Sequence, residues 1–165
     1  MSKFKIAATA LAGILATTAS ADTFEGYGSV EGWNVFIDHE KKSCLIELVD
    51  SAENVIQMGL TEDRSVGYLG VFTKGETDVK RDEEEDVAIL IGDNIYVGTA
   101  TGMRGNITAG YSGGYVTSDN PMFVKDIEQQ YEMIVFPEKE YSFIVDLTGT
   151  KKAIAMGREC NEKQM

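Results

Sequence analysis

The sequence predicts a mainly β protein, an antiparallel β-sandwich or barrel-like domain of about eight strands with two short helices. Short runs rich in aromatic and β-branched residues recur along the chain, and such residues suit the pleated surface of a strand. Turn-forming stretches such as Gly92-Asp93-Asn94 separate these runs at short intervals, which is typical of hairpins. Strand-like runs do not alternate with long helical ones, so an α/β fold is disfavoured.

The expected strands follow one another closely along the chain. Residues 86–91 and 95–97 form the clearest hairpin, because a Gly-Asp-Asn turn joins them. A second pair is expected across the turn that contains Pro137. In chain order, the expected strands are 32–38, 44–49, 54–60, 67–73, 86–91, 95–97, 132–136 and 141–147.

Two segments have the apolar spacing of helices. The first begins at Pro121 and has Asp119 or Asn120 as its N-cap, because these side chains accept hydrogen bonds from the free N–H groups of a first turn. Its spacing predicts one buried stripe of Phe123, Ile127 and Tyr131. The second helix follows residues 148–150, and its expected buried face consists of Ala153, Ile154, Gly157 and Cys160.

Residues 1–21 have the layout of a cleavable signal peptide. MSKFK supplies two lysines, residues 6–19 are small or apolar apart from threonine, and Ala19-Ser20-Ala21 is a small-x-small cleavage site. The run is too short for a membrane-spanning helix, which needs about 20 residues. We therefore expect cleavage before Asp22, a single β-rich domain over residues 22–165, and a periplasmic or secreted location.

The charge of the chain limits its partners. The formal net charge is −12, and binding to nucleic acid needs clustered Lys and Arg side chains. We expect no nucleic-acid partner, and no stretch of the mature chain is apolar for long enough to span a membrane.

The two cysteines, Cys44 and Cys160, are predicted to form a disulfide bond that tethers the C-terminal helix to an early strand. Two remaining thiols normally pair in an oxidising compartment. A zinc site would need three or four Cys or His ligands at close spacing, and His39 is the single histidine. A nucleophilic Cys–His pair is formally possible, but an unpaired thiol would be exposed to oxidation.

No cluster of residues predicts catalysis, a cofactor or a bound metal. The acidic run from Arg81 to Asp86 lacks the spaced ligands and turn glycine of a calcium loop, so we interpret it as a solvated turn. His39 lies in a polar turn, and the G-x-S-x-G motif is absent. A Ser-His-Asp triad can assemble from distant residues, but nothing selects its serine.

A possible interaction loop consists of Tyr111, Ser112, Gly113, Gly114 and Tyr115. Two tyrosines flank a flexible pair of glycines, and tyrosine provides a large contact area at low entropic cost. The alternative is a strand-turn-strand arrangement with the tyrosines on the sheet. The stretch does not follow the phosphate-binding pattern G-x-x-x-x-G-K-[ST].

Three features of the chain occur together: an early strand with Gly32, Trp33 and Val35, a strand that begins at Cys44, and the terminal segment DLTGTKKAIAMGREC. With the Asn120-Pro121 opening of the middle helix, this pattern resembles small secreted alphaproteobacterial envelope proteins of the invasion-associated locus B family. The resemblance implies a β-rich periplasmic or surface domain and supplies no catalytic residues.

The sequence therefore favours a non-enzymatic periplasmic or cell-envelope protein that binds an unknown protein or small ligand. The lack of a catalytic cluster and the family resemblance both favour this interpretation. The alternative is a periplasmic hydrolase or a divalent-cation-binding protein, which would require acidic side chains from different strands to converge.

Overall fold

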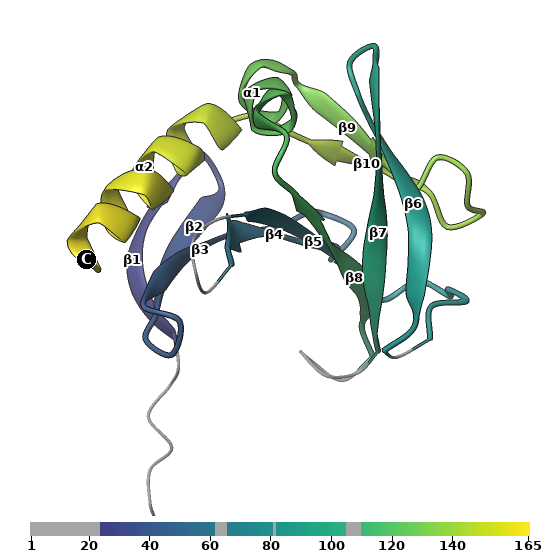
Figure 1. Ribbon diagram of the computed structural model, residues 1–165, viewed down its shortest axis with the longest axis horizontal. Coiled ribbons are helices and arrows are strands. Elements are labelled where there is room, and N and C mark those ends of the chain that lie inside the picture. Colours follow the sequence, from purple (N-terminus) through teal and green to yellow (C-terminus); the bar gives the residue numbers. More distant parts are fainter. Residues whose placement is uncertain (1–23, 62–65, 81, 105–109) are drawn as a thin grey trace, which may run out of the picture.

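A computed structural model describes residues 24–61, 66–80, 82–104 and 110–165 of the chain. The expected signal peptide, residues 1–21, lies outside the described residues. Ten strands and two helices make up the described part (Figure 1). The strands are β1 Phe24–Val30, β2 Trp33–Asp38, β3 Ser43–Val49, β4 Val55–Leu60, β5 Gly67–Thr73, β6 Glu84–Ile91, β7 Asn94–Arg104, β8 Ser112–Ser118, β9 Glu132–Val135 and β10 Phe143–Asp146; the helices are α1 Pro121–Gln129 and α2 Thr150–Lys163.

All of these strands form one antiparallel sheet in the order β1-β2-β3-β4-β5-β8-β7-β6-β9-β10. The prediction of a mainly β fold is confirmed. The predicted sandwich or barrel of about eight strands is wrong, because the sheet is open and has ten strands. The strands outside the expected set are β1 and β8, whose sequences FEGYGSV and SGGYVTS each contain two glycines. Glycine is depleted in strands because it has no side chain to pack.

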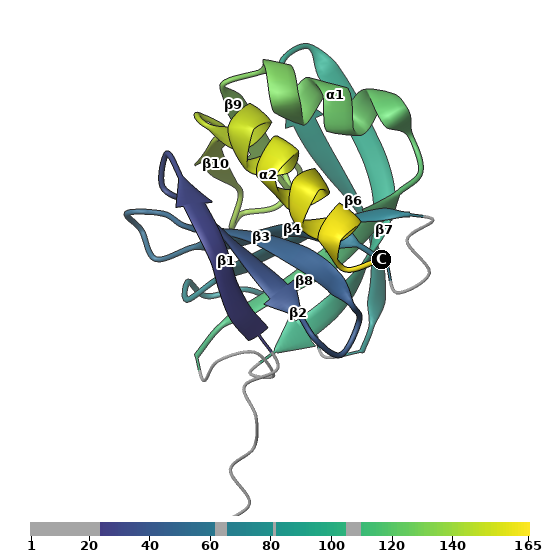
Figure 2. The same cartoon turned by 90° about the vertical axis from the view of Figure 1, so that its left-hand side faces the viewer.

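The hydrophobic core lies between one face of the curved sheet and the two helices. Figure 1 shows α1 and α2 on the same side of the sheet, and α2, which lies beside β1 in Figure 2, packs against β1, β2 and β3. Side chains along a strand alternate between its two faces, so every second residue points into this core. We call the opposite side of the sheet the outer face. The largest fully buried core side chains include Trp33, Ile56, Leu69, Ile89, Ile91, Met133 and Leu147.

Helix α1 begins as the sequence predicts but ends earlier. Asn120 is the N-cap and accepts a backbone hydrogen bond from the first turn, while Pro121 is the first helical residue. Phe123 and Ile127 are buried, which confirms two members of the predicted stripe. Tyr131 lies beyond the end of the helix and is 77% exposed, so its predicted burial is wrong.

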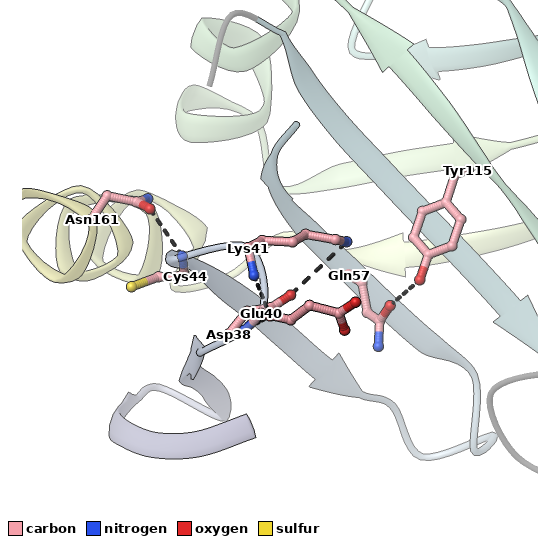
Figure 3. Close-up of polar contacts among 7 residues, drawn as sticks. All are labelled: Asp38, Glu40, Lys41, Cys44, Gln57, Tyr115 and Asn161. Carbon is pink, nitrogen blue, oxygen red and sulfur yellow. Dashed lines mark hydrogen bonds and ion pairs between the residues drawn. The ribbon is translucent and has the colours of Figure 1, made fainter. Parts of the chain in front are cut away.

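The predicted disulfide between Cys44 and Cys160 is confirmed. It joins β3 to α2 across a sequence separation of 116 residues, with 6.1 Å between the two Cα atoms. Asn161 reinforces the junction, because its side-chain oxygen accepts a hydrogen bond from the N–H of Cys44 at 2.9 Å (Figure 3). Closing so long a loop stabilises the fold by about 4–5 kcal/mol in the chain-entropy picture. The predicted buried face of α2 is also confirmed, namely Ala153, Ile154, Gly157 and Cys160.

Two of the segments that carry the family resemblance are in direct contact. The indole N–H of Trp33 in β2 donates a hydrogen bond to the carbonyl oxygen of Thr148 at 2.9 Å. Gly149 then adopts a positive φ of 86°, and a Cβ atom at this position would lie 2.7 Å from that of Glu31. The start of α2 is therefore held against the β1–β2 hairpin, where a side chain at residue 149 would be crowded as well as strained.

Candidate interaction surface

The residues of the predicted interaction loop lie mainly within β8. Ser112, Gly113 and Gly114 are buried in this strand, between β5 and β7, and Tyr115 follows them. A Cβ atom on Gly113 would overlap the backbone of β5, so this glycine permits close approach of two strands. Tyr111 precedes β8, and its ring centroid lies 5.3 Å from the Lys74 Nζ atom. An interaction role for these residues stays a prediction.

On the outer face of β4, β5 and β8, four side chains form a group that we call the tyrosine cluster: Gln57, Tyr68, Phe72 and Tyr115. The ring of Tyr115 packs edge to face against Tyr68 and Phe72, with centroid distances of 5.5 Å and 5.1 Å. Its hydroxyl donates a hydrogen bond to the side-chain oxygen of Gln57 at 2.7 Å (Figure 3). The amide of Gln57 in turn donates to the Glu47 carboxylate at 2.7 Å.

The two phenols of the cluster have raised pKa values. Burial, followed by the charge of Glu47, raises the pKa of Tyr115 from its ordinary 10.0 to about 12. Burial, followed by the neighbouring Tyr115 and Asp38, also raises the pKa of Tyr68. Both phenols therefore stay protonated at neutral pH, and that of Tyr115 acts as a hydrogen-bond donor.

Asp38 is buried at the end of β2, close to the tyrosine cluster. Its Oδ1 atom accepts hydrogen bonds from the backbone N–H groups of Glu40 and Lys41, each at 3.0 Å (Figure 3). The Nζ atom of Lys41 lies 3.9 Å from the other carboxylate oxygen and 5.7 Å from the ring centroid of Tyr68. Asp38 thus has partners within the chain, as do Gln57 and Tyr115, which favours a structural role for this region.

Arg81 of the acidic run lies outside the described residues, and the run is a turn only in part, because β6 begins at Glu84. Glu83, Glu84 and Glu85 line a hollow of about 320 Å³ beside the run. Its charges are partly balanced, because Lys80 pairs with Glu83 at 3.3 Å and Lys139 pairs with Glu85. Among the described residues, no group of three or more His, Cys, Asp or Glu side chains could hold a metal ion. The cation-binding alternative therefore gains no support from this part of the chain. The residues around the hollow include Asp78, Glu83, Glu84, Glu85, Phe136 and Tyr141.

His39 lies in the exposed turn between β2 and β3. Its ring Nε2 atom lies 2.9 Å from a carboxylate oxygen of Glu25. The described contacts of His39 include no serine or cysteine, so they do not form the Ser-His or Cys-His pair of a nucleophilic site.

The outer face of β7, β6, β9 and β10 carries a row of apolar side chains. Leu90 pairs with Ile95 on one side and with Ile134 on the other, and Ile134 pairs with Ile144. We call these four residues the apolar row. Leu90 and Ile134 are half-buried, whereas Ile95 and Ile144 are 68% and 58% exposed. Exposed apolar patches of this kind mark interaction sites.

Two further residues enlarge this surface. Val97, two positions from Ile95 on β7, is 76% exposed. Tyr131 lies beside the row and, together with Leu90, Ile134 and Ile144, lines an open hollow of about 570 Å³. An exposed tyrosine next to an apolar surface is typical of protein interfaces, because its ring is apolar and its hydroxyl is polar.

Two acidic residues border the apolar row. Glu132 of β9 and Asp146 of β10 are direct cross-strand partners, and both are exposed. Hydrogen bonds from the hydroxyl and the backbone N–H of Thr148 hold the pKa of Asp146 below its ordinary range. Like charges directly opposite one another destabilise a sheet, so a cation bound beside this pair would relieve an unfavourable interaction.

Sequence reasoning misses the apolar row, although the sequence contains a signal for it. Residues 87–91 are apolar at consecutive positions, so the strand they form is apolar on both faces. Such strands normally have both faces covered, but here the outer face is partly exposed.

None of the described helices is long and apolar enough to cross a membrane. No protein-family model, curated protein or solved structure matches the chain.

Proposed function

We propose that the chain is a secreted, non-enzymatic protein of the periplasm or cell envelope that binds a partner protein through the apolar row. One observation carries the proposal: apolar side chains follow one another across β7, β6, β9 and β10, and those of Ile95 and Ile144 are exposed. Removing such a surface from water on binding is favourable, and the entropic cost of association offsets part of that gain.

The location and the family are part of the same proposal. The signal-peptide layout of residues 1–21 supports secretion, and the disulfide supports an oxidising compartment. The contact between Trp33 and Thr148 links two segments of the pattern that resembles the invasion-associated locus B family. The hydrogen bonds that Tyr115, Gln57 and Asp38 make within the chain support a structural role for these three groups.

Site-specific photocrosslinking in intact cells tests this proposal. A photoreactive amino acid replaces Ile95 or Ile144, and the matched control replaces Val49, which is 50% exposed on β3. We expect one defined protein to crosslink from positions 95 and 144 but not from position 49.

The crosslinked protein is then purified and its affinity measured directly. We expect Ile144→Lys to weaken binding by at least about tenfold, because it places a charge in an apolar contact. Val49→Lys serves as the control and should leave the affinity unchanged. Equal crosslinking at all three positions, or none at positions 95 and 144, would contradict the proposal.

A second candidate function is the binding of a small apolar ligand, which one cavity favours. A cavity of about 210 Å³ lies between β3, β4, β5 and the two helices. An engineered apolar cavity of about 150 Å³ binds benzene, so the volume here suits a single ring or a short alkyl chain. Its apolar lining includes Ile46, Met58, Leu60, Phe123, Ile127 and Ile154.

Thermal unfolding with and without dissolved toluene tests the ligand candidate. Binding to the folded state should raise the midpoint, and Leu60→Trp should abolish the shift by filling the cavity. An unchanged midpoint for the natural protein would contradict this second candidate.

A further inference from the structure

Strand β10 leaves a free edge at the end of the sheet. Its single neighbour in the strand order is β9, and no other described helix or strand packs along it to a comparable extent. The unpaired N–H and C=O groups of an edge strand form a template on which another chain can pair.

The hydrogen bonding between β9 and β10 identifies the groups on that edge. The N–H of Leu147 donates to the carbonyl oxygen of Tyr131 at 2.8 Å. Residues of an antiparallel pair alternate between facing the partner strand and facing away from it. Val145 therefore bonds toward β9, whereas Ile144 and Asp146 direct their backbone groups toward the free edge.

The same two residues set the side-chain requirements of an added strand. Ile144 and Asp146 both lie on the outer face, because alternate residues of a strand share a face. A residue placed beside Ile144 would extend the apolar row. A residue placed beside Asp146 would meet a carboxylate whose other neighbour, Glu132, is also acidic, so Lys or Arg is favoured there.

We infer that β10 accepts an extended segment of a partner protein as an additional strand, with an apolar residue beside Ile144 and a Lys or Arg two positions away beside Asp146. The inference rests on the proposed function, since it assigns a chemistry to the partner of the apolar row. Main-chain hydrogen bonds supply the affinity in this mode of recognition, and alternate side chains supply the specificity.

Strand β10 of a second copy does not meet these requirements. Strand β10 has the sequence FIVD and contains no basic residue. Two copies would also bring together chains that each have a net charge of −12, which opposes association.

Two end-blocked, fluorescently labelled peptides test the charge requirement. One is Thr-Lys-Thr-Val-Thr-Lys-Thr, and in the other Glu replaces both Lys residues. Their binding to the exported protein, with its disulfide intact, is measured by fluorescence anisotropy. We expect the Lys peptide to bind at least about tenfold more tightly, because opposite charges attract across strands. Asp146→Lys should reverse that order.

N-methylated peptides test the backbone requirement. In an antiparallel arrangement, the N–H of the valine beside Ile144 points toward β10, while those of the adjacent threonines point away. N-methylation of the valine should weaken binding by about tenfold or more, whereas N-methylation of the adjacent threonines should change it less than about twofold. Ile144→Pro should also weaken binding, because it removes the outward N–H and spares the bonds to β9. Ile144→Thr keeps that N–H and should weaken it less.

The outcomes separate this inference from the proposed function. Equal binding of both N-methylated peptides, or no peptide binding at about 1 mM, would overturn strand addition. A different result would show that the apolar row binds without strand addition. In that case N-methylation has no effect, whereas Ile95→Lys weakens binding of the Lys peptide although residue 95 lies three strands from the edge. If N-methylation acts as expected but positions 95 and 144 give no crosslink in cells, the edge inference holds and the proposed function fails.

Discussion

Two regions of the same outer face differ in how far their large side chains are exposed to solvent. Over β4, β5 and β8, Phe72 is buried, and the hydroxyl of Tyr115 donates a hydrogen bond to Gln57. Over β7, β6, β9 and β10, Ile95 and Ile144 remain exposed. Both regions belong to one continuous sheet, so the fold alone does not explain the difference.

Glycines account for much of the contrast. The ring of Tyr115 lies against Gly70, and the hydroxyl of Tyr68 lies against Gly59, at positions where a Cβ atom would collide with them. These glycines leave room for the tyrosine side chains to approach the sheet closely and to fill its outer face. The apolar row has branched side chains at each paired position. We therefore expect the tyrosine cluster to contribute to stability and the apolar row to contribute to binding.

The largest expected effect comes from Gly70→Ala, which would displace the Tyr115 ring. The added methyl group would overlap that ring and approach Phe72, and overpacking of this kind costs roughly 1–3 kcal/mol. Gly26→Ala is the control, because a Cβ atom at Gly26 has no neighbour within 4 Å. Urea unfolding should show a clear loss for Gly70→Ala alone. Equal midpoints for the two variants would contradict the role assigned to the cluster.

High pH should also act on the tyrosine cluster. In the unfolded chain a tyrosine loses its proton near pH 10.0, whereas Tyr115 keeps its proton until about pH 12 in the folded state. Its contribution is therefore complete below pH 10 and is lost as the pH rises toward 12, because deprotonation then favours the unfolded chain. Tyr68 shifts in the same direction. Urea midpoints measured from about pH 9 to pH 11.5 should fall, and the fall should flatten in the double variant Tyr68→Phe, Tyr115→Phe.

A smaller effect is expected from Tyr115→Phe at neutral pH. The change removes the hydroxyl that donates to Gln57 and leaves a nearly buried amide oxygen without this donor, which costs about 1–2 kcal/mol. Tyr131→Phe is the matched control, since Tyr131 is 77% exposed, and surface changes stay within about 0.5 kcal/mol. If both variants unfold at the same urea concentration, the hydrogen bond contributes nothing measurable.

Local rules explain what the sequence predicts correctly. The Asn120 cap follows from side-chain chemistry within a few residues. The disulfide follows from the number of cysteines and the expected compartment. Strand propensity identifies the β-rich fold, and the alternative interpretation of the tyrosine-glycine stretch places tyrosines on the sheet, which is correct for Tyr115 in β8. The need for glycine at Gly113 comes from the neighbouring strand, so strand propensity does not reveal it.

The apolar row depends on strand pairing, which local rules do not determine. Leu90, Ile134 and Ile144 come from three separate strands, and they align only in the observed register. A shift of one residue in any of these strands would turn its outer side chains toward the core. From the sequence alone, the one sign of the row is therefore the unusual apolar run of β6, which makes both faces of that strand apolar.

Substitutions in and beside the apolar row should have the smallest effect on stability and the largest effect on binding. The triple variant Ile95→Thr, Val97→Thr, Ile144→Thr keeps β-branched residues that suit a strand and removes exposed apolar groups. Its free energy of unfolding should change by less than about 0.5 kcal/mol for each substitution, while binding of the partner protein should fall by about tenfold or more. Val49→Thr, an exposed change outside the row, should alter neither quantity. A loss of stability comparable to that of Gly70→Ala would mean that the row completes the core, because side chains exposed for binding add little to the folded state alone.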